Sequence, residues 1–526
     1  MNRILFLILI LILNFNFYFS QTPELEIGSM RKLENKKLPQ KIIGSDENYF
    51  YTVSWENVNE KHPNLIRLER YNVEELNLDT IWEFEMPKVM DISPKFENIF
   101  YLNGNLLLFT SGKDTEIQKN VLYLQKISPN GEVQGSFKSV GELSLYNDKK
   151  GGFNFKLTED KSKIVIFFYD TYENKYDKEP YTVKIIDGDM NEVFGRALKF
   201  PLQDRRFKVN DYKVSEKGNI YFSISAEKIT KRRKTKRPSR KIKKEKFDQI
   251  FLSYNAESFK FNSFLIDDPK FKPENLSFGI DAEENVHIFA FATKKSGSQF
   301  AGVFYRKISN ETEKIVKKSF KNFSKDKKFL KSFENERNGE DENEWFNYGI
   351  GDINFLQDGT IIFLAENKFT NVKIITGKTS SVKKINYHFC IDLLSVHVNE
   401  ESAIDWVVKI PKNQYSSNDN FYYSSYFVTN KENKLRIIFN DNPKNLNEKN
   451  PDKIKSIKKN AIYKPFSASA VILTLFSDGS YEKYELFTRN LKNFSTAPRL
   501  IFQKEDLFFI YAQQKKKYAF SSFELD

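Results

Sequence analysis

The sequence predicts an all-β protein built from one unit that repeats along the chain. A strand-like run is followed by a tight polar turn and then by a second run that is apolar on both faces, and this pattern occurs eight times. The second runs begin near Tyr49, Leu106, Lys163, Asn219, Val286, Thr360, Leu435 and Leu507, so successive copies lie 56 to 75 residues apart. Self-similarity at such a spacing indicates a repeat architecture. Aromatic residues make up 15% of the chain, and burying so many of them requires an extensive core.

The turns between the paired runs carry the residues that tight hairpins need. Examples are "NG" at 103–104, "KGN" at 217–219 and "QDGT" at 357–360. The second runs, such as "IVIFF" at 164–168, are apolar without alternation, so both of their faces must be covered. After most copies come two further runs that alternate between apolar and polar residues, as half-exposed strands do.

Two inner strands and two outer strands, repeated at this spacing, resemble the blade of a β-propeller. Radial stacking would explain the inner strands, because each blade is covered on both faces by its neighbours. The resemblance covers nearly the whole chain after residue 20 and implies a single domain, 21–526, of eight four-stranded blades. Seven blades are the alternative, since the first and last copies are the least regular. The chain has no repeated Trp-Asp ending, kelch Gly-Gly pair or sialidase box, so no named propeller family is assigned.

The ring must also close. The last copy has a third strand, "KYAFSSFEL" at 517–525, and no fourth. We expect "TPELEIGSMRKL", at 22–33, to supply the outermost strand of the final blade. This pairing would join the two ends of the domain and protect an open sheet edge.

Residues 1–20 predict a secretory signal peptide. Arg3 precedes an unbroken apolar run, Ile4 to Leu13, and the small residue Ser20 stands at the expected cleavage site. Ten apolar residues are short for a membrane span, which needs about twenty. Tyr18 fits the cleavage rule poorly, which leaves an uncleaved N-terminal anchor as the alternative.

The compartment follows from this signal and from composition. No second apolar span follows the signal, and the bias toward Lys, Asn, Ile and Phe is typical of AT-rich bacterial genomes. The ending "FSQ" of the signal resembles signals of Gram-negative bacteria that use type IX secretion. The sequence therefore predicts an exported protein of the periplasm or of the outer-membrane surface.

The net charge of +13 comes almost entirely from one insertion, 228–246, which has twelve basic residues and one acid. It joins two apolar runs, "NIYFSISA" and "FDQIFLSYN", and is expected to be a long loop. Its candidate contacts with a partner or polyanion are Lys231, Arg232, Arg233, Lys234, Lys236, Arg237, Arg240, Lys241, Lys243 and Lys244. An acidic protein, lipopolysaccharide or an acidic glycan would suit this charge. Nucleic acid is disfavoured because no aromatic residues are interleaved for base stacking. The alternative is a solvated loop without a ligand.

Propeller topology sends the loops that join second to third strands, and blade to blade, to one face. All the long insertions fall in these loops, so this face is where a binding site is expected. One of them, "PKNQYSSNDNFYYSSYF", offers Tyr415, Tyr422 and Tyr423 as possible aromatic contacts to a sugar or a protein. The alternative is that Tyr422 begins an inner strand with ordinary core aromatics.

The sequence points to no catalytic residue, metal or cofactor. It lacks the common hydrolase, metalloprotease and nucleotide-binding motifs, and its single cysteine, Cys390, reads as a buried core residue near His388. "IDGDMNE" lacks the glycine and the distal glutamate of a calcium loop. Carboxylate pairs for glycosidase chemistry would come from separate blades, so no local motif would mark them.

We therefore predict a non-enzymatic, exported binding or scaffold protein of the cell envelope that uses the long-loop face. The alternative is a polysaccharide-binding protein or a propeller-type glycan-active enzyme. The two differ in what they require at the mouth of the central funnel. A glycan site should bring two or more carboxylates and an aromatic side chain together there, whereas a scaffold should leave the funnel ordinary.

Overall fold

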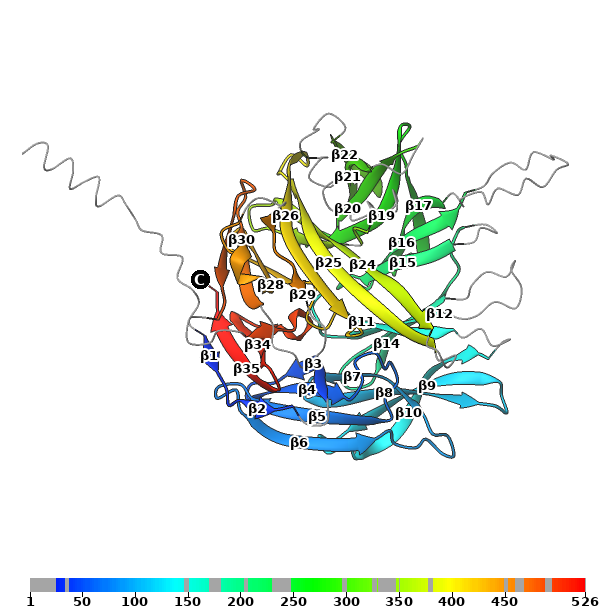
Figure 1. Cartoon of the computed structure of the whole chain (residues 1–526). Helices are drawn as coiled ribbons and strands as arrows, with labels where there is room; N and C mark the ends of the chain where they lie inside the picture. The colour runs from blue at the N-terminus through cyan, green and yellow to red at the C-terminus, as the bar shows by residue number, and fades with distance from the viewer. Residues whose placement is uncertain are drawn as a thin grey trace, which may run out of the picture.

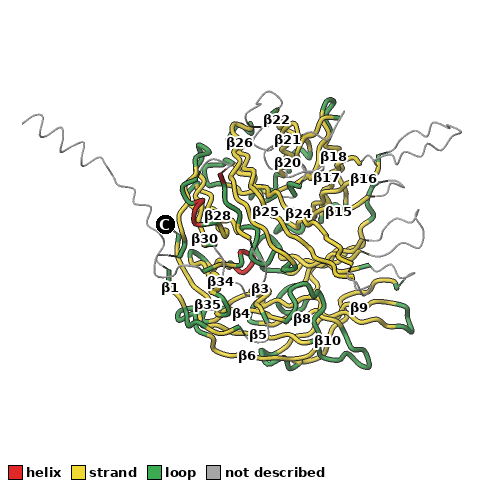
Figure 2. The backbone as a smooth tube through the Cα atoms, viewed as in Figure 1, coloured by secondary structure: helices red, strands yellow, loops and turns green. Residues whose placement is uncertain are grey.

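The computed structural model describes residues 25–33, 37–145, 151–169, 181–202, 207–228, 247–295, 300–323, 329, 347–349, 351–376, 382–448, 453–458, 468–487 and 494–525. Its described residues form eight antiparallel sheets that follow one another around a ring in chain order (Figure 1). Strands and the short loops between them account for almost all of the tube in Figure 2. The predicted eight-bladed β-propeller is confirmed. Among the described residues, no helix is long and apolar enough to cross a membrane.

The first four blades contain four strands each. Blade 1 is β3 (Leu38–Ser45), β4 (Tyr49–Trp55), β5 (Leu65–Asn72) and β6 (Leu78–Glu85). Blade 2 is β7 (Lys95–Leu102), β8 (Asn105–Asp114), β9 (Lys119–Ile127) and β10 (Val133–Ser144). Blade 3 is β11 (Gly152–Leu157), β12 (Ile164–Tyr169), β13 (Tyr181–Ile186) and β14 (Glu192–Leu198). Blade 4 is β15 (Phe207–Val214), β16 (Ile220–Glu227), β17 (Phe247–Asn255) and β18 (Lys260–Ile266).

The remaining blades are less uniform. Blade 5 is β19 (Phe271–Ile280), β20 (Val286–Lys294), β21 (Phe300–Ser309) and β22 (Lys314–Asn322). Blade 6 is β23 (Asp352–Phe355), β24 (Ile361–Thr376), β25 (Val382–Val398) and β26 (Ile404–Ser417), with the short β29 (Ile457–Lys458) added in parallel. Blade 7 is β27 (Phe427–Lys431), β28 (Lys434–Asp441), β30 (Ser469–Leu475) and β31 (Tyr481–Glu485). In blade 8, β32 (Ser495–Thr496) and β33 (Phe502–Lys504) both pair with β34 (Leu507–Gln514), which pairs with β35 (Lys517–Glu524).

The second strand of every blade begins within one residue of the position predicted from the apolar runs. These strands are buried because neighbouring blades pack their aromatic rings together. The rings of Phe289 in blade 5 and Phe363 in blade 6 stack with centroids 4.8 Å apart, and Phe50 in blade 1 meets Phe509 in blade 8 at 5.1 Å. Burying one such side chain stabilises the fold by about 1.5–3 kcal/mol. The ring of blades is therefore held together by contacts between blades.

The short turns take the geometry that their residues favour. Asn103 and Gly104, between β7 and β8, have φ of 49° and 75°. Glu432 and Asn433, between β27 and β28, have φ of 52° and 57°. Two successive residues of positive φ match the right-handed twist of a hairpin, and Asn and Gly reach this region at low cost.

The N-terminal segment closes the ring as predicted. β1 (Glu26–Ile27) and β2 (Arg31–Lys32) both pair antiparallel with β35, and the registers place Glu26 opposite Ser522 and Arg31 opposite Tyr518. Ile27 and Met30 pack on the core cluster that contains Phe508 and Phe523. β1 and the last strand, β35, lie side by side in Figure 1.

The first strands of several blades carry a β-bulge near their start. In blades 1, 2 and 4 the residues out of register near the start of the strand are Gln40, Glu97 and Asn210, which are all polar; β3 has a second irregularity at Ile43. A bulge re-aims a side chain relative to the regular alternation of a strand. Two of the three, Gln40 and Glu97, line the cavity described next.

Candidate functional site

A cavity of about 1430 Å³ opens on the long-loop face of the propeller, over blades 1, 2 and 3. Its walls are the starts of the first strands, the ends of the second strands and the loops that leave them. Asn420 and Arg499, from the segments that link blades 6 to 7 and 7 to 8, complete the lining. The cavity therefore lies on the face that propeller topology and the insertions indicated.

The cavity brings together carboxylates, aromatic rings and cations. The carboxylates are Glu60, Asp91, Glu97, Asp114 and Glu116. The aromatic residues are Trp55, Phe96, Tyr123, Phe153 and Tyr169. The basic residues are Lys41, Lys61, His62, Lys95, Lys113 and Arg499. This is the combination of carboxylates and aromatics that the sequence reasoning required of a glycan site.

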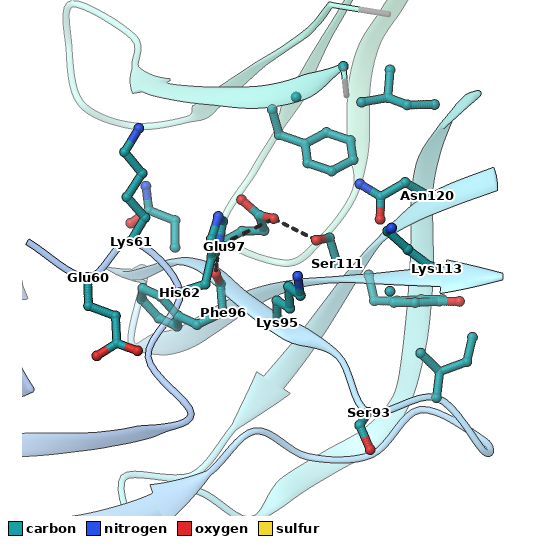
Figure 3. A pocket seen from close by; sticks show the side chains of 18 of the residues that line it. Glu60, Lys61, His62, Ser93, Lys95, Phe96, Glu97, Ser111, Lys113 and Asn120 are labelled. Carbon is teal, nitrogen blue, oxygen red and sulfur yellow. Dashed lines mark hydrogen bonds and ion pairs between the residues drawn. The ribbon is translucent and has the colours of Figure 1, made fainter. Parts of the chain in front are cut away.

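Glu97 is the most constrained of these carboxylates. Ser111 Oγ donates a 2.6 Å hydrogen bond to Glu97 Oε1, and His62 Nδ1 lies 3.8 Å from the same oxygen (Figure 3). His62 Nδ1 donates a hydrogen bond to the carbonyl oxygen of Phe96 at 2.7 Å. The other ring nitrogen, Nε2, takes no part in this bond. Burial raises the pKa of the Glu97 carboxyl above its ordinary value, and the hydrogen bond from Ser111 and the charge of His62 oppose this only in part. The raised pKa favours the protonated form of the Glu97 carboxyl more than in an exposed glutamate.

Two cations lie deeper in the cavity wall. Lys41 Nζ donates to Asn98 Oδ1 at 3.1 Å and lies 4.0 Å from the centroid of the Phe100 ring. Burial lowers the pKa of this amine to about 8. Arg499 Nη2 donates to Gln40 Oε1 at 2.7 Å, and its guanidinium lies 4.2 Å from the centroid of Tyr422. Arg499 is open to the cavity yet surrounded by protein, and this desolvation lowers its pKa.

The aromatic residues suggested by the sequence occupy different places. Tyr422 and Tyr423 are buried in the core cluster of blades 1 and 8, with exposures of 0% and 3%. Tyr422 OH donates to the carbonyl of Pro39 at 2.6 Å, so this tyrosine supports Arg499 from beneath and presents no free ring to the surface. Tyr415 is half-buried and packs on Phe389, with ring centroids 5.1 Å apart. The structure thus favours core packing for Tyr422 and Tyr423.

The candidate residues of the basic insertion, Lys231 to Lys244, lie outside the described residues. The chain leaves β16 and returns at β17 on the same face, and Lys228 Nζ at its root lies 3.5 Å from Asp248 Oδ1. Among the described residues, no group of three or more His, Cys, Asp or Glu could hold a metal ion. His388 bonds to Thr370 at 3.0 Å, and burial raises the pKa of the nearby Cys390 thiol.

Sequence reasoning missed Lys41, Glu97 and Arg499. Each is an ordinary residue in its local stretch, and the cavity unites them from strands and linkers up to about 460 positions apart. The only local signal is a polar residue inside the first run of a copy, as at Gln40 and Glu97. Such a residue marks a bulge once the register of the hairpin is known.

No protein-family model matches the chain, and no curated protein matches it. Among solved structures, the chain is similar to a polysaccharide lyase PL25 ulvan lyase bound to -[GlcA(1-4)Rha3S]-, at 10% identity, with a TM-score of 0.36 over 88% of this chain and 95% of that one. It is similar to the polysaccharide lyase Uly1 at 10% identity, with a TM-score of 0.35 over 95% of this chain and 100% of that one. It is also similar to the β-propeller domain of the Trilobed protease from Pyrococcus furiosus at 9% identity, with a TM-score of 0.32 over 86% of this chain and 98% of that one.

Values this low carry no argument about what the chain binds or does. The architecture is established by the chain's own sheets: it is an eight-bladed β-propeller closed by its N-terminal segment.

Proposed function

We propose that the protein is an exported polysaccharide-binding propeller whose ligand occupies the cavity over blades 1 to 3. The observation that carries this proposal is the meeting of carboxylates and aromatic rings in one cavity on the long-loop face. Sugar rings are bound by stacking on aromatic faces and by polar side chains that accept and donate hydrogen bonds to hydroxyls. At about 1430 Å³ the cavity exceeds the roughly 300–1,000 Å³ of small-molecule pockets, so it suits a stretch of an oligosaccharide.

Export and an envelope location remain predictions from the signal-like N-terminus and enter the proposal as such. The scaffold function predicted from the basic insertion also stays a prediction, because that insertion lies outside the described residues. A glycan-binding propeller and a protein-binding insertion are compatible on one face.

The test is isothermal titration with oligosaccharides from envelope and matrix polysaccharides, using the mature chain and two cavity variants. Tyr169 is 42% exposed at the cavity wall, so Tyr169→Ala should weaken binding by about tenfold through the loss of a stacking surface. Trp55→Phe, a milder change at the same wall, should weaken it less. Tyr415→Ala is the matched control, because Tyr415 lies in blade 6 and does not line the cavity. Equal binding by wild type, Tyr169→Ala and Trp55→Phe would reject the cavity as the glycan site.

One observation favours a second function, cleavage of the bound glycan. Glu97 has the raised pKa that a general acid needs, and Asp91, Asp114 and Glu116 line the same cavity as candidate second carboxylates. In hydrolysis Glu97 would give its proton to the leaving glycosidic oxygen as its bond to the anomeric carbon breaks, while one of the other carboxylates takes a proton from the water that adds to that carbon. New reducing ends that depend on Glu97, and are lost in Glu97→Gln, would support cleavage. Binding without new reducing ends would leave a binding protein.

A further inference from the structure

Lys41 and Arg499 are cations of the cavity wall that form no ion pair with a described residue; Lys41 is partly buried and Arg499 is exposed to the cavity. Neither lies within 4.0 Å of a carboxylate of any described residue, and both line the cavity. Removing a charge from water is costly unless an opposite charge or a set of hydrogen bonds compensates for it. Two cations in one cavity wall that no described carboxylate neutralises, one of them partly buried, are therefore available to an anion from solution.

Three other buried lysines show how the same fold treats a lysine that has only a structural role. Lys409 Nζ lies 2.8 Å from Asp392 Oδ2, Lys483 Nζ lies 3.2 Å from Asp441 Oδ2, and Lys412 pairs with Glu366. Their side chains are 4%, 2% and 0% exposed. All three lie in blades 6 and 7, away from the cavity. Each of these lysines has its own carboxylate, whereas Lys41 has none among the described residues.

The immediate neighbours of Lys41 leave its charge uncompensated. Among the described residues it contacts the amide oxygen of Asn98 and the face of Phe100, and the same amide oxygen also accepts from the backbone N–H of Ile99 at 2.9 Å. Burial lowers the pKa of the Lys41 amine, and no described charged neighbour offsets this. The ammonium therefore keeps donors that no described residue uses.

Arg499 is in a similar state. One of its nitrogens donates to Gln40, the residue next to Lys41, and the plane of the guanidinium rests on Tyr422. Asp419 raises the pKa of Arg499 from more than 4.0 Å away. Its Oδ1 accepts from Ser416 Oγ at 2.6 Å and from the backbone N–H of Phe421 at 3.2 Å, and its buried Oδ2 has no hydrogen-bond partner among the described residues. A planar guanidinium with free donors is well matched to a carboxylate or sulfate.

We propose that Lys41 and Arg499 form an anion-binding subsite in the cavity, which receives the carboxylate or sulfate of an acidic sugar residue. This inference rests on the proposed function and narrows its ligand to acidic polysaccharides. The other charges that line the cavity are Lys61, His62, Lys95 and Lys113, and Glu60, Asp91, Glu97, Asp114 and Glu116. The carboxylates among them disfavour a uniformly charged polyanion and favour one whose acidic groups are spaced along the chain.

The subsite makes binding and protonation interdependent. An anion beside Lys41 favours the charged amine and raises its pKa again. Because the pKa in the free protein is about 8, binding at pH 8 should take up protons, and affinity should fall as the pH rises above 8. Lys41→Arg removes this behaviour, since a guanidinium stays charged throughout.

The experiment is titration calorimetry at pH 8 in buffers of different ionisation enthalpy, with three probes. Oligogalacturonate offers carboxylates, dextran sulfate offers sulfates, and dextran is the neutral form of the second probe. The proteins are the wild-type chain, Lys41→Gln, Arg499→Gln, Lys41→Arg and the control Lys373→Gln, an exposed lysine of β24 outside the cavity. Thermal unfolding confirms that each variant is folded.

We expect at least tenfold tighter binding of one acidic probe than of dextran, with proton uptake. Lys41→Gln and Arg499→Gln should each lose about tenfold for that probe and leave dextran unchanged. Lys41→Arg should keep the affinity and lose the proton uptake, and Lys373→Gln should match the wild type. The acidic probe that binds shows whether the subsite takes a carboxylate or a sulfate.

The subsite and the proposed function fail in different ways. If glycans bind but acidic and neutral probes are equal, or Lys41→Gln and Arg499→Gln change nothing, the subsite is wrong and glycan binding stands. If no polysaccharide binds in the cavity at all, both are wrong.

Discussion

The short turns and the cavity wall of the propeller use their polar side chains differently. On the face of the short turns, an Asp or Asn side chain accepts hydrogen bonds from the backbone of its own turn in seven of the eight blades, counted over the described residues. These residues are Asp46 and Asn72 in blade 1, Asn130 in blade 2, Asp160 and Asp187 in blade 3, Asn255 in blade 4, Asp281 in blade 5, Asp358 and Asn399 in blade 6, and Asp478 in blade 7. On the long-loop face, Asn57, Asp114, Asp268, Asp419 and Asn442 do the same for their own loops, whereas Glu60 and Asp91 of the cavity wall accept no hydrogen bond from a described residue.

This difference separates structural polar groups from those available to a ligand. A carboxylate that accepts from backbone N–H groups is satisfied by the fold, and its removal leaves those donors without a partner. A polar group in a cavity wall that the fold leaves unsatisfied contributes little to stability and is free to bind. Residue type alone does not distinguish the two, since both faces are rich in Asp and Glu.

The largest expected effect is on the short-turn face. Asp281 accepts from the backbone N–H of Asn285 at 2.7 Å and from His287 Nε2 at 2.9 Å. Asp281→Ala should lower the free energy of unfolding by about 2–3 kcal/mol, because buried donors lose their acceptor. Asp91→Ala, at an exposed carboxylate of the cavity, should change it by less than about 0.5 kcal/mol. Urea denaturation measures both, and equal losses would remove the distinction between the short turns and the cavity wall.

The free energy of unfolding should rise at alkaline pH because of Lys41 in the cavity wall. The folded pKa of Lys41, about 8, lies below its ordinary value of 10.5, so burial of the charged amine costs stability below pH 8. That cost is relieved as the pH rises from 8 toward 10.5, by about 1–2 kcal/mol once screening by cavity water is allowed for. We expect Lys41→Met to be at least as stable as the wild type at pH 7 and to lack this rise. A Lys41→Met variant that is clearly less stable at pH 7 would contradict the absence of a partner.

The turn carboxylates should respond to acid with the opposite sign. Burial tends to raise the pKa of Asp160, but hydrogen bonds from Ser162 and Thr158 outweigh it and lower the pKa to about 2. A folded pKa below the unfolded one gives stability that is present above pH 4 and is lost as the pH falls toward 2. The melting temperature should therefore drop in this window, and Asp160→Asn should reduce the drop slightly. An unchanged profile in Asp160→Asn would assign the acid sensitivity to other groups.

The smallest effect on stability is expected from the basic insertion. β16 and β17 pair up to Glu227 and Phe247, so replacing 229–246 by a flexible loop of about eight residues keeps the hairpin register. This replacement about halves the loop, and loop closure changes by about 0.6 kcal/mol per doubling of length, so the free energy of unfolding should change by less than about 1 kcal/mol. Glycan binding in the cavity should persist, while a crosslinked pull-down from envelopes reports whether a protein partner is lost. Loss of glycan binding would extend the ligand site beyond the cavity.

The fold was predictable because its signals are local. A run such as the one from Ile164 to Phe168, apolar on both faces, can only be an inner strand, and the turns beside it are chemically distinct. Closure of the ring could be predicted because the last blade had one unpaired strand edge and the segment 22–33 had no partner of its own. Each of these inferences needed only neighbouring residues and the period of the repeat.

The site was not predictable because it depends on register and on distant contacts. The bulges at Gln40 and Glu97 change the alternation that sequence patterns assume. The contact between Gln40 and Arg499 joins the first strand of blade 1 to the segment between β32 and β33 of blade 8, and no local pattern encodes it. Tyr422 lies among Ser and Asn residues that suggest a surface loop, yet its hydroxyl reaches the carbonyl of Pro39, so the ring is buried.

The pairing of β1 and β2 with β35 also sets the order in which the molecule can be completed. β1 and β2 cannot pair until β35 has been made, so the ring stays open until synthesis or translocation of the chain ends. A circular permutant that joins residue 525 to residue 25 and opens the chain at 34–36 would replace this seam by a covalent link. Such a chain should fold faster and resist unfolding from its ends, because its final blade would no longer depend on a meeting of the two termini.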